Sequence, residues 1–207
     1  MPLRAQLAVA LATVFVIVAA GFAILGGDEP TAEGRDTFEG SLRPPDVLPA
    51  DFRLVDQDGE TVTLRQFRGT PVVVTFLYTT CEDTCPLTTQ QIRGALDDLG
   101  HDVPVLAIAV DPPNDTAEKA RRFLAEQRMT GRMRFLLGPD AELRRQWKAY
   151  GTQRQTSKQE HSGYTILLDR RGVQRIGFPA DQVTPEALAH DLALLEREPR
   201  PADPAAP

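Results

Sequence analysis

Cysteine is almost absent from this sequence: among its 207 residues there are two, Cys81 and Cys85, four positions apart. A disulfide stabilises a fold most when it joins distant segments, and a loop that encloses so few residues removes little entropy from the unfolded chain. The pair is therefore a poor candidate for an inert staple, although such bonds persist outside the cytoplasm. It is a better candidate for a redox couple or for part of a metal site.

Clusters of basic residues are also missing. The formal net charge is −6, the pI is near 5.1, and the Lys and Arg residues are scattered along the chain. This pattern argues against a nucleic-acid partner. With 42% hydrophobic and 25% charged residues the composition is ordinary for a globular protein. Once both ends are set aside, roughly 150 residues remain, enough for one domain with its own core.

The N-terminal segment is the longest stretch without charge. Residues 7–25 contain no charged side chain, Arg4 precedes them, and Asp28 and Glu29 follow. A helix of that length spans about 28 Å, close to the roughly 30 Å hydrocarbon core of a bilayer. We expect residues 1–27 to form one transmembrane anchor, or a cleaved signal. The charge pattern predicts a cytoplasmic N-terminus and an extracytoplasmic domain, at a bacterial cytoplasmic membrane.

Between the two ends the chain predicts one α/β domain. We assign residues 28–44 to a flexible tether, 45–197 to the domain and 198–207 to a disordered tail. The predicted elements are a hairpin at 52–64, strands at 71–78, 103–110, 133–138, 164–169 and 173–178, and helices at 86–99, 117–128, 141–150 and 184–196. This order is that of a thioredoxin-like fold: a central mixed sheet flanked by helices, with an N-terminal β-hairpin and an inserted segment.

The cysteines lie between the buried strand at 71–78 and the helix that follows it. The carboxyl end of such a strand is where sites form in open α/β sheets. Pro86 suits the first position of the helix, so we expect Cys85 near its N-cap. Unpaired N–H groups there favour thiolate over thiol, and the thiolate is both the nucleophile and the metal ligand.

The surroundings of the pair differ from those of an ordinary thioredoxin couple. The spacer has three residues where thioredoxin motifs have two, and no proline occurs between Pro139 and Pro179 to precede the later strand. His161 lies there instead, at a position from which its loop could face the cysteines. Two thiolates and one imidazole form a three-coordinate set that suits Cu(I), whereas zinc normally takes a fourth ligand.

Other candidate ligands have simpler explanations. His101 lies at a helix–strand turn and His190 on the last helix, so we expect surface or core roles for both. Asp111 and Asp115 follow the strand at 103–110, and strand-end and helix-capping roles explain them better than metal ligation.

Three segments, in order, resemble the Sco/SenC family of membrane-anchored, thioredoxin-like copper proteins. They are YTTCEDTCP (78–86), AIAVDPPNDT (107–116) and HSGYTILLD (161–169). The resemblance covers roughly residues 45–197 and implies that Cys81, Cys85 and His161 are copper ligands. Two positions depart from the family pattern: Glu160 stands where Asp often precedes the histidine, and Ile166 where an aromatic residue is common. Neither departure removes a ligand.

The resemblance implies a role in assembling the CuA centre of cytochrome c oxidase subunit II. The leading hypothesis is a copper chaperone that binds one copper ion, as Cu(I) or Cu(II), and passes it to that partner. The alternative is a thiol–disulfide oxidoreductase that keeps the CuA cysteines reduced through Cys81 and Cys85. Further expected partners are another periplasmic copper chaperone and a thioredoxin-like reductase. A peroxiredoxin-like peroxidase is a third hypothesis, weakened because residues 74–81, VTFLYTTC, lack the proline of a PxxxTxxC motif.

Overall fold

The strands of the protein form one mixed sheet and one separate hairpin in a computed structural model that describes residues 37–44, 51–152 and 163–199. From Phe38 onward these residues belong to one folded unit. The elements in chain order are β1 (Ser41–Leu42), β2 (Arg53–Val55), β3 (Thr61–Thr63), the 3-10 helix η1 (Leu64–Phe67), β4 (Val72–Leu77), α2 (Thr84–Leu99), β5 (Val105–Ala109), α3 (Ala117–Glu126), β6 (Arg134–Leu136), α4 (Asp140–Tyr150), β7 (Tyr164–Leu168), β8 (Gln174–Pro179) and α5 (Pro185–Arg197).

The larger sheet has the strand order β1-β8-β7-β4-β5-β6. Strands β4, β5 and β6 run parallel, while β7 is antiparallel to β4 and β8 is antiparallel to β7. Every residue of β4 and β5 is buried. A strand covered on both faces needs apolar side chains at every position, and the VVVTFL and VLAIA sequences of these strands nearly meet that condition.

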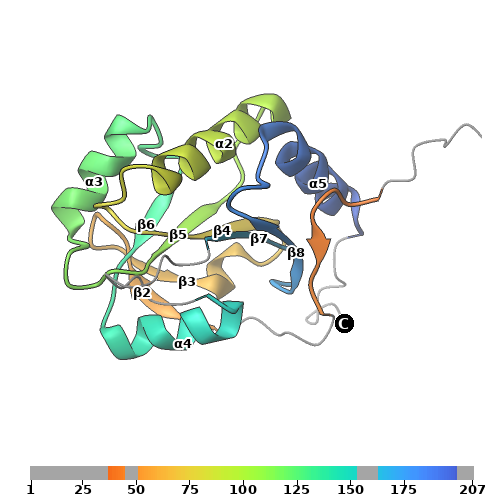
Figure 1. Cartoon of the computed structure of the whole chain (residues 1–207). Coiled ribbons are helices and arrows are strands. Elements are labelled where there is room, and N and C mark those ends of the chain that lie inside the picture. Colours follow the sequence, from red (N-terminus) through yellow and green to blue (C-terminus); the bar gives the residue numbers. More distant parts are fainter. Residues whose placement is uncertain (1–36, 45–50, 153–162, 200–207) are drawn as a thin grey trace, which may run out of the picture. The chain divides into compact units, whose positions relative to one another are not determined.

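Helices cover both faces of this sheet (Figure 1). Helices α2 and α5 pack against each other on one face, and α4 lies on the other. On the α4 face the ring of Tyr150 packs 5.5 Å from that of Phe76, centroid to centroid, and the indole N–H of Trp147 donates to the carbonyl of Ala109 at 2.9 Å. These contacts fix α4 beneath β4 and β5, the two strands that lead to the cysteine loop and to its neighbour.

The predicted element types are confirmed, and several details differ. Thr116 and Thr184 cap α3 and α5, because their hydroxyls accept N–H groups of the first turn. Helix α2 begins at Thr84, two residues earlier than predicted, with Asp83 at its N-cap. Pro86 is tolerated as the third residue because the first four N–H groups of a helix have no intrahelical partner.

A short strand was not predicted. Residues of β1, inside the range that the sequence assigns to the tether, pair with β8, Ser41 with Gly177 and Leu42 with Ile176. Just before it, the side chain of Asp191 accepts the backbone N–H groups of Glu39 at 2.8 Å and Gly40 at 3.0 Å. Asp191 is fully buried on α5, so this carboxylate ties the start of the folded unit to the last helix. Two paired residues are too few to give a sequence pattern.

The expected membrane anchor, residues 1–27, lies outside the described residues. Within the part of the chain that the structure describes, no helix has the length and apolar character needed to cross a bilayer.

The Asp191 contact gives a first prediction. Asp191→Ala removes the acceptor of two backbone N–H groups, and a hydrogen bond to a charged group contributes about 1.5–3 kcal/mol to stability. We expect the amides of Glu39 and Gly40 to exchange with solvent markedly faster in native-state hydrogen exchange. Glu186→Ala, which removes an exposed carboxylate from the first turn of α5, is the control and should leave those amides protected. Unchanged exchange in Asp191→Ala would contradict the proposed tie.

Candidate metal centre

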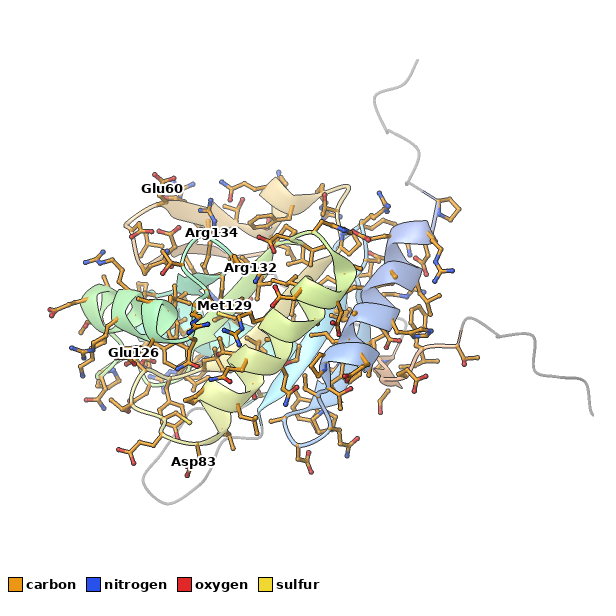
Figure 2. The ribbon with its side chains drawn as sticks, turned by 90° about the horizontal axis from the view of Figure 1, so that it is seen from above. Glu60, Asp83, Glu126, Met129, Arg132 and Arg134 are labelled. Carbon is orange, nitrogen blue, oxygen red and sulfur yellow. The ribbon has the colours of Figure 1, made fainter. Side chains whose placement is uncertain are left out.

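Both cysteines lie at the carboxyl edge of the parallel strands. Cys81 follows β4 within the short loop to α2, and Cys85 is the second residue of that helix. Cys81 is 9% exposed and Cys85 only 1%. Asp83, between them in sequence, points outward at the beginning of α2 (Figure 2). The pair is therefore recessed, with Cys81 as the more accessible sulfur.

The beginning of α2 directs hydrogen-bond donors at the Cys81 sulfur. The backbone N–H of Cys85 donates to Sγ of Cys81 at 3.2 Å, and the Thr84 hydroxyl lies 3.4 Å from the same atom. The N–H of Cys81 in turn donates to the carbonyl of Tyr78 at 3.3 Å, which closes the loop as a turn. Donors at a helix N-terminus stabilise a negative charge on the sulfur. The two cysteines are not joined in a disulfide.

The two thiols differ in acidity. A hydrogen bond from the Cys85 side chain, assisted by Thr84 and the Cys85 backbone and opposed by burial, lowers the pKa of Cys81 from 9.0 to about 4. The pKa of Cys85 is raised, first because its proton is held in that same hydrogen bond and second because the side chain is buried. The position of the pair in the sequence predicted thiolate character for both cysteines and did not distinguish them. The reduced site holds one thiolate on Cys81 and one proton on Cys85.

A small cleft of about 40 Å³ lies beside Cys85. It is bordered by the end of β4, the first turn of α2, Ala180 and Gly163. Gly163 is two positions from His161, the third predicted ligand, which itself lies outside the described residues. The described residues contain no group of three or more His, Cys, Asp or Glu side chains suited to a metal ion.

The two other histidines have the structural roles that the sequence suggested. Nε2 of His101 lies 2.9 Å from the carboxylate of Glu196, and this contact raises the pKa of the half-exposed imidazole. Nδ1 of His190 lies 3.0 Å from Asp191 on the same helix. Neither residue borders the cleft beside Cys85.

Asp115 makes a contact that sequence reasoning missed. Its buried side chain accepts the backbone N–H and the hydroxyl of Thr79, at 2.7 and 2.8 Å, and the N–H of Asp111 at 3.1 Å. Burial, only partly offset by these hydrogen bonds, raises the pKa of Asp115. The expected structural role holds, but the partner is the cysteine loop, 36 residues earlier in the chain. No local pattern indicates a partner at that separation.

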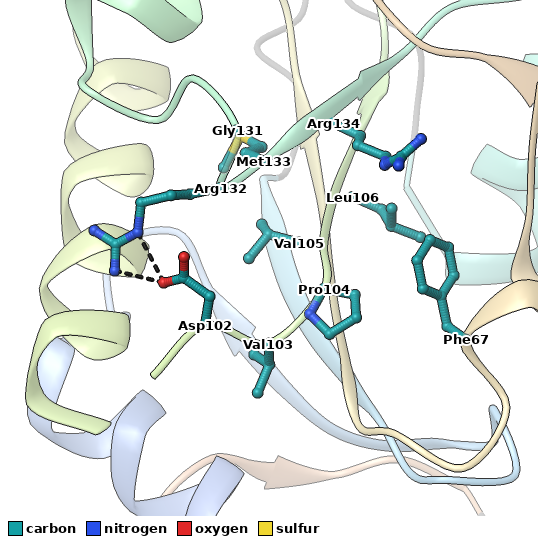
Figure 3. Close-up of a pocket in the computed structure, with 10 residues that line it drawn as sticks. All are labelled: Phe67, Asp102, Val103, Pro104, Val105, Leu106, Gly131, Arg132, Met133 and Arg134. Atoms are coloured by element: carbon teal, nitrogen blue, oxygen red, sulfur yellow. Dashed lines mark hydrogen bonds and ion pairs between the residues drawn. The ribbon is translucent and has the colours of Figure 1, made fainter. Parts of the chain in front are cut away.

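A larger cleft of about 270 Å³ lies at the opposite edge of the sheet, at the amino ends of β5 and β6 (Figure 3). Its guanidinium groups are already paired: Arg132 with Asp97 and Asp102, at 2.8 and 2.7 Å, and Arg134 with Asp56 at 3.0 Å. It contains no cysteine or histidine. The donor atoms needed for soft-metal or thiol chemistry are therefore at the cysteine edge.

The unequal acidities give a second prediction. In the reduced protein, alkylation of Cys81 by iodoacetamide should depend on a pKa far below 9.0, because the folded state stabilises the thiolate. That contribution to the stability of the reduced fold is fully present above 9.0 and is lost as pH falls through about 4. Cys85→Ala removes the largest cause and should raise the apparent pKa of Cys81, whereas Cys85→Ser keeps a hydroxyl donor and should raise it less. Equal profiles for the three proteins would contradict this assignment.

Residues 41–195 match the family model described as SCO1/SenC. The chain is 29% identical over 154 residues to Protein SenC of Rhodobacter capsulatus, covering 70% of this chain and 68% of that protein. The match spans smaller shares of other relatives, 35% of SCO1 homolog 1 of Arabidopsis thaliana and 40% of the SCO1 homolog of Bacillus subtilis. This chain is also 33% identical over 141 residues to a Mycobacterium tuberculosis protein named as a peroxiredoxin, and the match covers 68% of this chain and 80% of that protein.

The fold agrees with the sequence matches. The structure of Bradyrhizobium japonicum ScoI with copper bound superimposes with a TM-score of 0.62 at 29% identity, covering 72% of this chain and 99% of that one. Thus the mixed sheet flanked by helices is the thioredoxin-like α/β fold of Sco proteins. Because the family model matches most of the chain, the protein belongs to the SCO1/SenC family.

Proposed function

We propose that this protein is a copper chaperone that binds one copper ion, Cu(I) or Cu(II), through the thiolates of Cys81 and Cys85 and the imidazole of His161. The observation that carries the proposal is the recessed thiol pair at the beginning of α2, with donors directed at Cys81. The structure of ScoI of B. japonicum with copper bound supports the choice of metal. A further solved structure, of a protein called BsSco, is described as that of a member of the Sco family of cytochrome c oxidase assembly proteins.

The residues present fit a soft monovalent cation. Thiolate sulfur prefers Cu(I), and a set of two sulfurs and one nitrogen leaves no need for a fourth ligand. Gly163 borders the same cleft as Cys85. His161 precedes Gly163 by two positions in the sequence, which supports its choice as the third ligand. Glu160, which directly precedes the histidine, supplies a carboxylate that could orient the imidazole.

The unequal thiols determine how copper is gained and released. The proton on Cys85 must leave when both sulfurs bind, so copper uptake releases a proton and is weaker in acid. The lower exposure of Cys85 means that an incoming ligand reaches Cys81 first. Transfer to a partner then begins when a ligand of the partner replaces the Cys81 sulfur on copper. The buried Cys85 sulfur is the second of the two thiolates to dissociate. The proposed recipient is the CuA site of cytochrome c oxidase subunit II, with another periplasmic copper chaperone as donor.

The same geometry supports a second function, reduction of the CuA cysteines. The Cys81 thiolate would attack the target disulfide, forming a mixed disulfide and releasing one target thiolate. Cys85, after losing its proton, would attack Sγ of Cys81 and release the second. Two electrons pass to the target and leave a Cys81–Cys85 disulfide, which a thioredoxin-like reductase must restore. The greater exposure of the Cys81 sulfur and the Cys85 N–H that donates to it favour this alternative.

The likeness to a protein named as a peroxiredoxin keeps peroxidase activity as a further alternative. Against it, the β4–α2 segment lacks the proline of the PxxxTxxC motif. A peroxidase supplied with a thiol reductant would reduce many equivalents of peroxide. A cysteine pair without peroxidase activity would react with one equivalent of peroxide and form its disulfide.

We also propose the location that the sequence predicts. Residues 1–27 anchor the protein in the bacterial cytoplasmic membrane, and the residues between this anchor and Phe38 link it to the domain. At the other end, Glu198 pairs with Arg175 at 2.8 Å, so the proposed tail follows Glu198. The thiol site then works on the extracytoplasmic side, where the oxidase subunit presents its copper site.

Copper retention is the direct test. His161→Ala should weaken Cu(I) affinity at least ~10-fold, measured by competition with a chromophoric Cu(I) chelator, because one of three ligands is lost. His101→Ala and His190→Ala are matched controls and should keep the affinity of the unmodified protein. Cys81→Ser and Cys85→Ser should lose Cu(I) binding and the Cu(II)–thiolate charge-transfer bands. Unchanged affinity in His161→Ala would eliminate the three-ligand site.

Rescue of oxidase assembly separates the two leading functions. In cells that lack this protein, a chaperone needs all three predicted ligands, so the His161→Ala variant should fail to restore the CuA spectrum. A reductase needs the cysteines alone, and in that case His161→Ala restores assembly while Cys81→Ser and Cys85→Ser do not.

A further inference from the structure

A buried carboxylate connects the loop after β5 to the cysteine loop after β4. Asp115 is only 6% exposed. One of its oxygens accepts both the N–H and the hydroxyl of Thr79, and the other accepts the N–H of Asp111. The two loops are neighbours because β4 and β5 pair in parallel, with Leu77 opposite Ala109 at their ends.

Capping of α3 does not require this carboxylate. The hydroxyl of Thr116 already accepts the N–H of Lys119 at the beginning of that helix. All three hydrogen bonds of the Asp115 side chain go elsewhere, two of them to Thr79. Burying a carboxylate is unfavourable unless hydrogen bonds offset the loss of water. The burial of Asp115 is therefore explained by its hydrogen bonds, two of which go to Thr79 in the cysteine loop.

The contact with Thr79 constrains the sulfur of Cys81. Thr79 lies inside the turn that the Cys81 N–H closes by donating to Tyr78. The Thr79 N–H and the Tyr78 carbonyl belong to the same peptide unit, so the bond to Asp115 orients the carbonyl that accepts the Cys81 N–H. The hydroxyl contact fixes the side chain of Thr79. The Cys81 side chain leaves this turn two residues later, where its Sγ meets the Cys85 N–H. We propose that Asp115 is a positioning residue that holds Cys81 in the geometry for copper binding and for thiol exchange.

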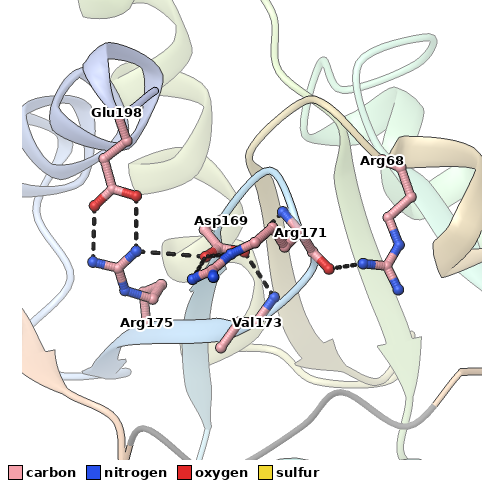
Figure 4. Close-up of polar contacts among 6 residues, drawn as sticks. All are labelled: Arg68, Asp169, Arg171, Val173, Arg175 and Glu198. Carbon is pink, nitrogen blue, oxygen red and sulfur yellow. Dashed lines mark hydrogen bonds and ion pairs between the residues drawn. The ribbon is translucent and has the colours of Figure 1, made fainter. Parts of the chain in front are cut away.

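Asp169 offers a matched comparison at the other edge of the sheet. It is 3% exposed and accepts the N–H groups of Arg171 and Val173, both at 2.9 Å (Figure 4). Its carboxylate also pairs with the guanidinium of Arg171 at 3.0 Å. Asp169 also pairs with Arg175 at 3.5 Å, so it stabilises a turn between neighbouring strands with partners two, four and six residues away. Substitution of Asp169 should lower the free energy of unfolding, as substitution of Asp115 does, but should leave the geometry of the two cysteines unchanged.

The first experiment measures the dithiol–disulfide equilibrium of the pair against glutathione, in the full chain and without copper. One glutathione disulfide oxidises Cys81 and Cys85 and yields two molecules of glutathione. In Asp115→Ala the reduced pair loses its aligned Cys85 N–H contact, so we expect oxidation to become ~10-fold more favourable. Asp169→Ala should change this equilibrium constant less than twofold, while both variants lower the urea midpoint of unfolding.

Thr79→Val is the second test variant, and it replaces Asp115→Ala if that variant is too unstable to purify. It keeps the side-chain shape and the backbone N–H and removes only the hydroxyl donor. We expect a shift in the same direction as for Asp115→Ala but smaller. In the double variant the Thr79→Val change should add nothing further, because its acceptor is already gone. An equilibrium constant unchanged in Thr79→Val, or shifted equally by Asp115→Ala and Asp169→Ala, would overturn the positioning role.

The second experiment rests on the proposed function and measures Cu(I) affinity. Asp115→Ala should weaken it ~10-fold, as residues that orient ligands typically do, and Asp169→Ala should not. Retention of full Cu(I) affinity in Asp115→Ala would contradict the copper part of the proposal. If the unmodified protein binds no Cu(I), the chaperone function fails, whereas the glutathione equilibrium still decides whether Asp115 positions Cys81.

Discussion

A single hydrogen bond, from the backbone N–H of Cys85 to the sulfur of Cys81, organises the chemistry of this protein. It exists because a helix begins at Thr84 and leaves its first N–H groups without intrahelical partners. The sulfur of Cys81 accepts one of these free N–H groups, and the thiol of Cys85 donates a further hydrogen bond to the same sulfur. The hydrogen bond between the two thiols, assisted by this N–H contact, therefore makes their acidities unequal before any metal or partner arrives.

The contact depends on the sheet beneath it. Strand β4 is buried at every position and brings the chain to the edge where α2 begins, and β5 ends beside it in register. Helices cover both faces of the sheet, so the short loop after β4 is flanked by packed elements. A site on such a loop is precise because the elements that flank it are rigid. This is the arrangement that the thioredoxin-like fold uses for thiol chemistry, adapted here to a three-residue spacer.

Buried carboxylates supply the remaining constraints. Asp191 holds the start of the folded unit, Asp169 closes the turn between β7 and β8, and Asp115 holds the cysteine loop. Each is almost inaccessible to water and each accepts backbone N–H groups. In all three cases an unfavourable burial is offset by hydrogen bonds that determine the path of the chain. The three sites differ in what their partner does, and only that of Asp115 lies beside the thiols.

Local sequence determined much of this protein. Nearly all-apolar strands, threonine caps and the turn between β2 and β3, where Gly59 takes a positive φ, act over a few residues, so the element order and the thioredoxin-like class follow from them. The spacing of Cys81 and Cys85 beside Pro86, together with His161, determined the proposed ligand set. The tertiary structure alone decided which thiol carries the charge, because that depends on donors brought together by the helix start and on burial. It alone revealed β1 and the bond from Asp115 to Thr79, since contacts between residues far apart in the chain arise only when strands pair and leave no local pattern behind.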